Sequence, residues 1–205
     1  TGPIMLLEGV FQPEDLQTCL ALNLTHVVHR PEQIDWIAAL DTRQTQRVML
    51  KLDSGMNRLG FAPVDYGAAY ARLRALPQVA SITHMTHFAD ADREHGTDQQ
   101  WAVFQDATAG LPGERCLCNS AATLRLGRDR KLGGDWVRVG ISNYGCSPDY
   151  PQHDSAHWDL QPAMSLRAGL IAVHTLAAGA SICHEFTKQF SEPRLPCLRQ
   201  HEERA

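Results

Sequence analysis

Short apolar runs alternate with segments of helical periodicity along most of the chain. The run Arg47–Leu52 is typical of a buried strand, whereas Val64–Leu76 carries Tyr66, Tyr70 and Leu73 at helical spacing. Predicted strands cover Pro3–Leu7, His26–His29, Arg47–Leu52, Val79–Phe88, Arg115–Asn119 and Trp136–Tyr144. Predicted helices cover Pro13–Leu22, Pro31–Leu40, Val64–Leu76, Asp98–Leu111 and Ser120–Leu126. This repeated order predicts a parallel sheet whose strands are joined by helical crossovers.

Six such units fit either an open doubly wound sheet or part of an eight-stranded barrel. No Gly-x-Gly-x-x-Gly motif opens the first helix, so the dinucleotide-binding version of the open sheet loses support. A full barrel takes about 250 residues. A chain of 205 residues with six units would be two units short of one.

Composition and charge narrow the class of protein. The chain is 43% hydrophobic and 20% charged, with a formal net charge of −4, which is typical of a globular protein and gives no support for nucleic-acid binding. No apolar stretch approaches the roughly 18 residues of a membrane span. Six cysteines spread over a long chain favour reduced thiols in the cytoplasm over a disulfide framework, and the N-terminus does not resemble a signal peptide.

The pattern changes after Tyr144. The segment Cys146–His157, rich in Pro, Asp and His, is interpreted as a linker, and Leu166–Leu176 is rich in β-forming residues. We therefore expect a partial barrel over residues 1–157 and the beginning of a C-terminal β domain over residues 158–205. The charged end, Glu192–Ala205, is expected to be frayed.

In parallel α/β folds the chemistry lies at the carboxyl ends of the strands. Four successive predicted strands bring polar residues to that rim, namely Lys51, Asp53, Arg58, His84, His87, Asn119, Ser120 and Arg138. Each of them has a structural explanation, such as a cap, a solvated charge or an ion pair. Their joint occurrence on one rim favours a functional site.

Asn119 and Ser120 join a strand directly to a helix. Ser120 is a natural N-cap, but a helix N-terminus also offers free N–H groups to a phosphate. Gly140 and Ile141 follow the last predicted strand and can supply a further backbone N–H. Barrel phosphate sites favour the loops after the last strands, so the sequence predicts a phosphate site here.

Several long segments of the chain form specific motifs. The most specific is Lys51-Leu-Asp-Ser-Gly-Met-Asn-Arg-Leu-Gly-Phe61, and the others are Ile4–Val10, Met85–Asp92, Cys118–Thr123, Trp136–Gly145 and Leu160–Leu166. Together, and in family order, they resemble the bacterial alanine racemases, the fold-type III pyridoxal-phosphate enzymes. It implies an α/β fold, a partial (β/α)₈ TIM-type barrel of about six βα units with the first two missing. It also implies pyridoxal 5′-phosphate as cofactor, alanine as substrate and a homodimer.

The same resemblance assigns roles to individual residues. It places His87 beside the pyridine ring, and Arg138 on the pyridine nitrogen. Arg58 would lie near the substrate carboxylate, and Lys51 would match a carbamylated lysine that orients Arg58. The remaining cofactor-binding residues are implied to be Leu7, Asn119, Ser120, Gly140 and Ile141. Arginine does not release its proton near neutral pH, so Arg138 would leave the ring nitrogen unprotonated.

The family's two proton-transfer bases have no counterpart in the chain. Its only lysines are Lys51, Lys131 and Lys188, and none matches the family's Schiff-base lysine, which lies on the first barrel strand. The opposing catalytic tyrosine of the C-terminal domain is also unmatched, and residues 183–185 depart from the family pattern. We therefore expect a racemase truncated at both ends, inactive by itself.

Two other functions fit parts of the sequence. The retained cofactor residues fit a non-catalytic remnant that binds pyridoxal phosphate. The pairs His26/His29 and His84/His87, with Lys51, fit a metal-dependent barrel hydrolase. Residues i and i+3 of a strand point to opposite faces, so neither histidine pair forms a ready metal site, and we expect no metal. Cys116 and Cys118 share a strand face but are interpreted as core residues.

Overall fold

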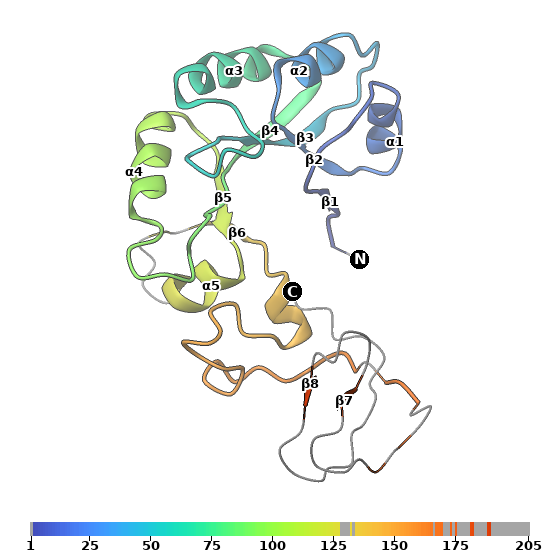
Figure 1. Ribbon diagram of the computed structural model, residues 1–205. Coiled ribbons are helices and arrows are strands. Elements are labelled where there is room, and N and C mark those ends of the chain that lie inside the picture. The colour runs from blue at the N-terminus through green and yellow to red at the C-terminus, as the bar shows by residue number, and fades with distance from the viewer. Residues whose placement is uncertain are drawn as a thin grey trace. The chain divides into compact units, whose positions relative to one another are not determined.

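The computed structural model describes residues 2–127, 132, 134–165, 167–169, 173, 175, 181–182 and 188–189. Its contacts divide the chain into two units, Thr1–Ala163 and Met164–Ala205. The first unit holds a six-stranded parallel sheet in sequential order, β1 to β6, with helices along its outer side (Figure 1). This is part of a TIM-type barrel, so the predicted fold class is confirmed.

The elements follow the predicted alternation of strand and helix closely. The strands are β1 (Met5–Leu6), β2 (Thr25–Val28), β3 (Gln46–Lys51), β4 (Val79–Met85), β5 (Glu114–Cys118) and β6 (Trp136–Val137). The helices between them are α1 (Asp15–Ala21), α2 (Pro31–Ala38), α3 (Pro63–Ala75), α4 (Asp98–Ala107) and α5 (Ser120–Leu126). Proline begins both α2 and α3, because its fixed φ suits the first helical turn and the N–H it lacks has no partner there.

Alternate strand residues point to opposite faces of the curved sheet. Val27, Met49, Met85 and Cys116 form a buried apolar cluster on the inner face. The outer face packs against the helices, where Tyr66 is fully buried. This inward and outward alternation delivers every second side chain of β3 and β4 to the inner face.

Cys116 and Cys118 do not share a face, contrary to the prediction. The register between β5 and β6 shifts between these two residues. Cys116 therefore joins the inner cluster, whereas Cys118 packs in the outer core. Both are buried free thiols.

The predicted strand Trp136–Tyr144 is wrong beyond Val137. After β6 the chain turns at Gly140 and forms a 3₁₀ helix, Ile141–Tyr144. Gly145 ends this helix in the left-handed conformation, with a φ of 82°. The apolar residues of this segment suggested a strand, but only the first two extend the sheet.

The predicted linker Cys146–His157 is also wrong, because it folds against the barrel. Asp149 is only 2% exposed and accepts hydrogen bonds from His153 Nδ1 (2.7 Å) and Trp158 Nε1 (2.8 Å). Burial alone would raise the pKa of Asp149, but these bonds outweigh it and lower the pKa. Asp149 also lies 3.8 Å from Arg125 Nε of α5.

The second unit contains one antiparallel pair among its described residues, β7 (Ser181–Ile182) with β8 (Lys188–Gln189). Most of the predicted β segment Leu166–Leu176, and the end Glu192–Ala205, lie outside the described residues. That residues 158–205 begin a β domain remains a prediction. None of the helices in the described ranges has the length and hydrophobicity needed to span a membrane.

Candidate active site

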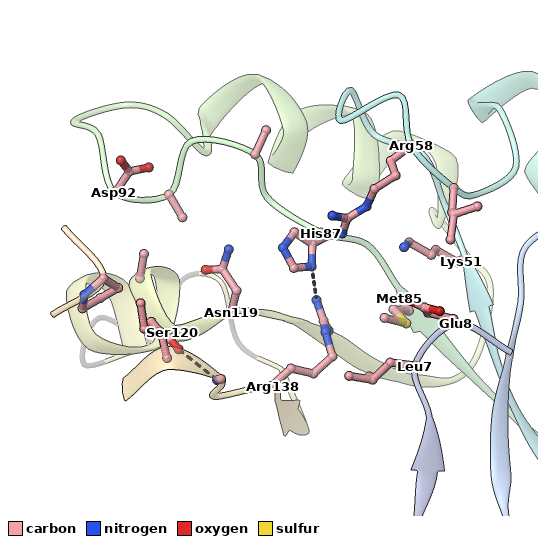
Figure 2. Close-up of a pocket in the computed structure, with 17 residues that line it drawn as sticks. Leu7, Glu8, Lys51, Arg58, Met85, His87, Asp92, Asn119, Ser120 and Arg138 are labelled. Atoms are coloured by element: carbon pink, nitrogen blue, oxygen red, sulfur yellow. Dashed lines mark hydrogen bonds between the residues drawn. The ribbon is translucent and has the colours of Figure 1, made fainter. Parts of the chain in front are cut away.

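A cavity of about 540 Å³ lies at the carboxyl ends of the strands (Figure 2). All nine site residues predicted from the sequence line it: Leu7, Lys51, Arg58, His87, Asn119, Ser120, Arg138, Gly140 and Ile141. They come from the ends of five of the six strands of the sheet, and β2 contributes none. The structure therefore brings together residues that are as much as 134 positions apart, from 7 to 141.

The prediction missed eight further residues of the lining: Glu8, Leu59, Met85, Ala89, Ala91, Asp92, Ala121 and Pro148. Met85 was accessible to sequence reasoning, since it lies two positions before His87 in the predicted strand Val79–Phe88 and would therefore share a face with it. Pro148 was not, because its segment was interpreted as a linker.

A closed loop after β3 carries Arg58. Asp53 Oδ1 accepts hydrogen bonds from the backbone N–H of Gly55 (3.0 Å) and Asn57 (2.9 Å). The loop returns to the strand at Phe61, whose N–H donates to the carbonyl of Lys51 (2.8 Å). Local side-chain and backbone bonds thus fix the loop, and Figure 2 shows Arg58 directed into the cavity.

Lys51 is the last residue of β3, and its side chain reaches the cavity wall although the residue is only 5% exposed. Burial, followed by the neighbouring charges of Arg58 and Arg138, lowers the pKa of Lys51 below its usual range. Asp53 and Glu8 act in the opposite direction but do not reverse the shift. The site therefore favours the neutral amine more than water does.

Arg138 is held by backbone groups and not by a carboxylate. Its guanidinium donates to the carbonyl oxygens of Cys116 (2.8 Å), Thr86 (2.7 Å) and Leu117 (3.1 Å). Neutral acceptors fix its position without neutralising it, so its positive charge acts on the cavity.

His87 lies beside this charge, with its Nδ1 3.5 Å from Arg138 Nη2. Burial, and then the charges of Arg138, Arg58 and Lys51, lower the pKa of His87 to about 4. Because arginine can only donate, Nδ1 is the acceptor of this contact, and the proton of the neutral ring lies on Nε2. His87 therefore presents a neutral, flat imidazole to the cavity at physiological pH.

The lowered pKa of His87 predicts that the protein loses stability in mild acid. The unfolded chain binds a proton at this position below a pH of about 6.5, whereas the folded chain binds it only near pH 4. Unfolding therefore becomes easier as the pH falls through this window, and His26 and His84, whose pKa values burial also lowers, act in the same direction. Urea unfolding at pH 7 and pH 5 should show a smaller free energy at pH 5, and His87→Gln should reduce the difference. An equal or larger free energy at pH 5 in the unmodified protein would contradict this reading.

The sequence predicts Ser120 as the N-cap of α5, but in the structure Asn119 occupies this position. Asn119 Oδ1 accepts from the Ala122 N–H (3.0 Å), while its Nδ2 donates to the Phe88 carbonyl (3.1 Å). This leaves the Ser120 hydroxyl free of the capping role. Ser120 Oγ instead accepts from the Gly140 N–H (2.9 Å), which ties the start of α5 to the loop after β6.

The Ser120 hydroxyl retains a donor for a ligand. Both of its bonds, from the N–H of Gly140 and of Ser142 (3.4 Å), use the oxygen as acceptor, so its proton is uncommitted. The Ile141 N–H also donates no hydrogen bond within the described residues. One side of the cavity therefore offers a hydroxyl and a backbone amide to an anion.

His26 and His84 turn away from the cavity. His84 Nδ1 forms a hydrogen bond with the Tyr66 hydroxyl (2.8 Å), and the His84 ring stacks on Tyr70. His26 Nε2 forms a hydrogen bond with Gln46 Oε1 (2.8 Å). Each histidine is buried between the sheet and the helices. Both have structural partners, and in the described ranges no three His, Cys, Asp or Glu side chains gather as metal ligands.

These features define an α/β protein, part of a barrel, whose cavity at the carboxyl ends of the strands is lined by Lys51, Arg58 and Arg138. Residues 1–148 match the family "Alanine racemase, N-terminal domain". The chain belongs to this family.

Known relatives agree with this assignment. The chain is 59% identical over 181 residues to an alanine racemase of Methylibium petroleiphilum, covering 88% of this chain and 49% of the relative. The biosynthetic alanine racemase of Pseudomonas aeruginosa superposes with a TM-score of 0.84 at 37% identity, over 94% of this chain and 53% of that chain. The alanine racemase of Acinetobacter baumannii gives a TM-score of 0.82 at 30% identity, over 93% of this chain and 53% of that one. The chain thus spans about half the length of the curated relatives it matches.

Proposed function

We propose that the chain forms the barrel part of an alanine racemase and binds pyridoxal 5′-phosphate in the cavity at the strand ends. The observation that carries this proposal is the convergence of all nine predicted residues on one cavity. Its volume of about 540 Å³ lies within the range of cofactor sites. Neither a non-catalytic remnant nor a metal hydrolase is favoured by the relatives, which are named as alanine racemases.

The donors of the cavity fit the phosphate of this cofactor. The free proton of Ser120 and the N–H of Ile141 would hold phosphate oxygens, with Asn119 fixing the helix that carries Ser120. Gly140 has no side chain to obstruct this approach. Arg58 and Arg138, which line the same cavity, supply the positive potential that a dianion requires.

His87 and Arg138 fit the ring of the cofactor. The neutral imidazole of His87 would lie beside the pyridine, and Arg138 would donate to its nitrogen. When bound, pyridoxal phosphate supplies an electron sink that makes the α-hydrogen of an amino acid easier to remove. Because Arg138 donates without giving up its proton, it limits the strength of this sink and so disfavours side reactions.

Lys51 and Arg58 fit the remaining charges of the site. Arg58 is directed into the cavity and would bind the carboxylate of alanine (Figure 2). The lowered pKa of Lys51 favours the neutral amine, which is the form that reacts with carbon dioxide. A carbamylated Lys51 would carry a negative charge and could orient Arg58 by pairing with it.

Racemisation also needs two bases, one on each face of the α-carbon, to take and to return the proton. No residue of the chain matches either base of the family, so the 205-residue polypeptide by itself is expected not to racemise alanine. The complete protein would act as a homodimer in the cytoplasm.

Conversion of L-alanine to D-alanine by the protein at its natural length tests this proposal. We expect conversion that depends on added pyridoxal phosphate and continues after treatment with a metal chelator. A protein that binds the cofactor without forming D-alanine would be the non-catalytic remnant. Formation of D-alanine that the chelator abolishes, or that does not need the cofactor, would contradict the proposal.

A further inference from the structure

Gln100 lies behind the cavity, on α4, and does not line it. It is only 7% exposed, yet all of its hydrogen-bonding groups are in use. Its Oε1 accepts from the Ala89 N–H (2.8 Å), and its Nε2 donates to the carbonyl of His87 (3.0 Å) and to Ser54 Oγ (3.1 Å). The side-chain amide of Gln100 thus forms hydrogen bonds with the backbone on both sides of Phe88, at the His87 carbonyl and the Ala89 N–H.

The bond to Ser54 continues as a directed chain. Thr86 Oγ1 donates to the Leu52 carbonyl (3.0 Å), so its contact with Ser54 Oγ (2.7 Å) must be accepted by Thr86 and donated by Ser54. Ser54 in turn accepts from Gln100. Each hydroxyl gives one proton and receives one, and the two N–H groups of Gln100 are the first donors of the network.

This network joins the two loops that supply the cavity with its central side chains. Ser54 belongs to the loop that carries Arg58, and Thr86 immediately precedes His87. Gln100, on α4, contacts both loops. Among the described residues, it is the side chain that donates a hydrogen bond to the His87 carbonyl.

We infer that Gln100 is a positioning residue that holds His87, and with it the loop of Arg58, in place for the cofactor. The inference rests on the proposed function for the cofactor's location. Gln100 acts through the backbone of His87 and through Ser54, and it contacts neither cofactor nor substrate.

The variant Gln100→Glu isolates the two donated bonds. An ionised glutamate still accepts from Ala89 but has no proton for His87 or Ser54, whereas a protonated glutamate regains one donor. We expect about tenfold weaker binding of pyridoxal phosphate than in the control at pH 8, with the deficit shrinking as the pH falls toward 6. The matched control is Gln99→Glu, the same change on the exposed neighbouring residue of α4, and each affinity is taken as a ratio to the control at the same pH. Equal affinities of the two variants at every pH would overturn the inference.

A second variant tests the role of Gln100 by hydrogen exchange, which does not require the cofactor. Gln100→Met has nearly the same length and removes all three bonds, so the Ala89 N–H should exchange with solvent about tenfold faster than in Gln99→Met. Unchanged exchange at Ala89 would show that Gln100 does not hold this loop. If the unmodified protein binds no pyridoxal phosphate, the proposed function fails, while the exchange measurement still decides the role of Gln100 in the loop.

Discussion

Replacing Arg138 with leucine is expected to weaken the binding of pyridoxal phosphate by up to about a hundredfold, because the charge-assisted hydrogen bond proposed from its guanidinium to the pyridine nitrogen is lost. The same change removes one hydrogen-bond donor from each of the carbonyl groups of Thr86, Cys116 and Leu117. Since these three residues are buried, we expect the free energy of unfolding to fall by about 2–3 kcal/mol. Cofactor titration and urea unfolding measure the two effects separately.

Arg72→Leu is the matched control for this prediction. Arg72 pairs with Asp35 on the surface, where both side chains are about half exposed or more (49% and 62%). An exposed pair of this kind contributes about 0–1 kcal/mol, and it lies outside the cavity. If Arg138→Leu retained the cofactor as well as Arg72→Leu does, Arg138 would not be part of the site.

Gly60→Ala is expected to disrupt the loop that carries Arg58. Gly60 has a φ of +135°, and an added Cβ would lie 2.5 Å from the backbone nitrogen of Asp53. That nitrogen donates to the Phe61 carbonyl (2.9 Å), so it cannot move without opening the loop. We expect a loss of about 1–3 kcal/mol in the free energy of unfolding from backbone strain alone, together with weaker binding of alanine.

Gly67→Ala is the comparison variant, for which we expect the free energy of unfolding to rise instead of fall. Gly67 lies within α3, and a Cβ there meets no atom within 4 Å. Alanine in a helix interior is more stable than glycine by about 0.5–1 kcal/mol, so this variant should gain stability and leave the site intact. Two Gly→Ala changes seven positions apart, at 60 and 67, should therefore have opposite signs. Equal effects of the two changes would contradict the proposed role of the Gly60 backbone.

Local patterns were sufficient to predict the elements that form the sheet. Periodicity located all six strands and the helices between them, because each helix buries one face and each strand lies in a buried sheet. The rule that chemistry gathers at the carboxyl ends of parallel strands placed Lys51, His87 and Ser120 on one rim, and one cavity contains them. The individual roles of these residues come from the family resemblance and remain predictions.

Features that depend on tertiary contacts could not be predicted from the sequence. Asn119 and Ser120 both have side chains that can cap a helix. In the structure Asn119 caps α5, while Ser120 accepts a hydrogen bond from the N–H of Gly140, a contact that the local sequence does not reveal. Asp149 lies in a segment with the composition of a linker. Its buried carboxylate accepts a hydrogen bond from Trp158 and lies near the charge of Arg125, and neither contact is visible in the local sequence.

Gln100 shows the same limit at the site itself. It follows an identical residue, Gln99, and nothing local distinguishes the two beyond their positions on α4. Their environments differ because α4 packs one face against the loops after β3 and β4, which makes Gln100 buried and Gln99 exposed.

The central claim is that the cavity binds pyridoxal phosphate, through its phosphate as well as its ring, for the racemisation of alanine. The most direct measurement reconstitutes the natural-length protein, freed of cofactor, with either pyridoxal 5′-phosphate or pyridoxal, and follows the formation of D-alanine from L-alanine. We expect D-alanine with pyridoxal phosphate and at least about tenfold less with pyridoxal at the same concentration, since pyridoxal has a neutral hydroxyl in place of the phosphate proposed to bind the Ser120 hydroxyl and the Ile141 N–H. No D-alanine with pyridoxal phosphate, or equal formation with both compounds, would contradict the account.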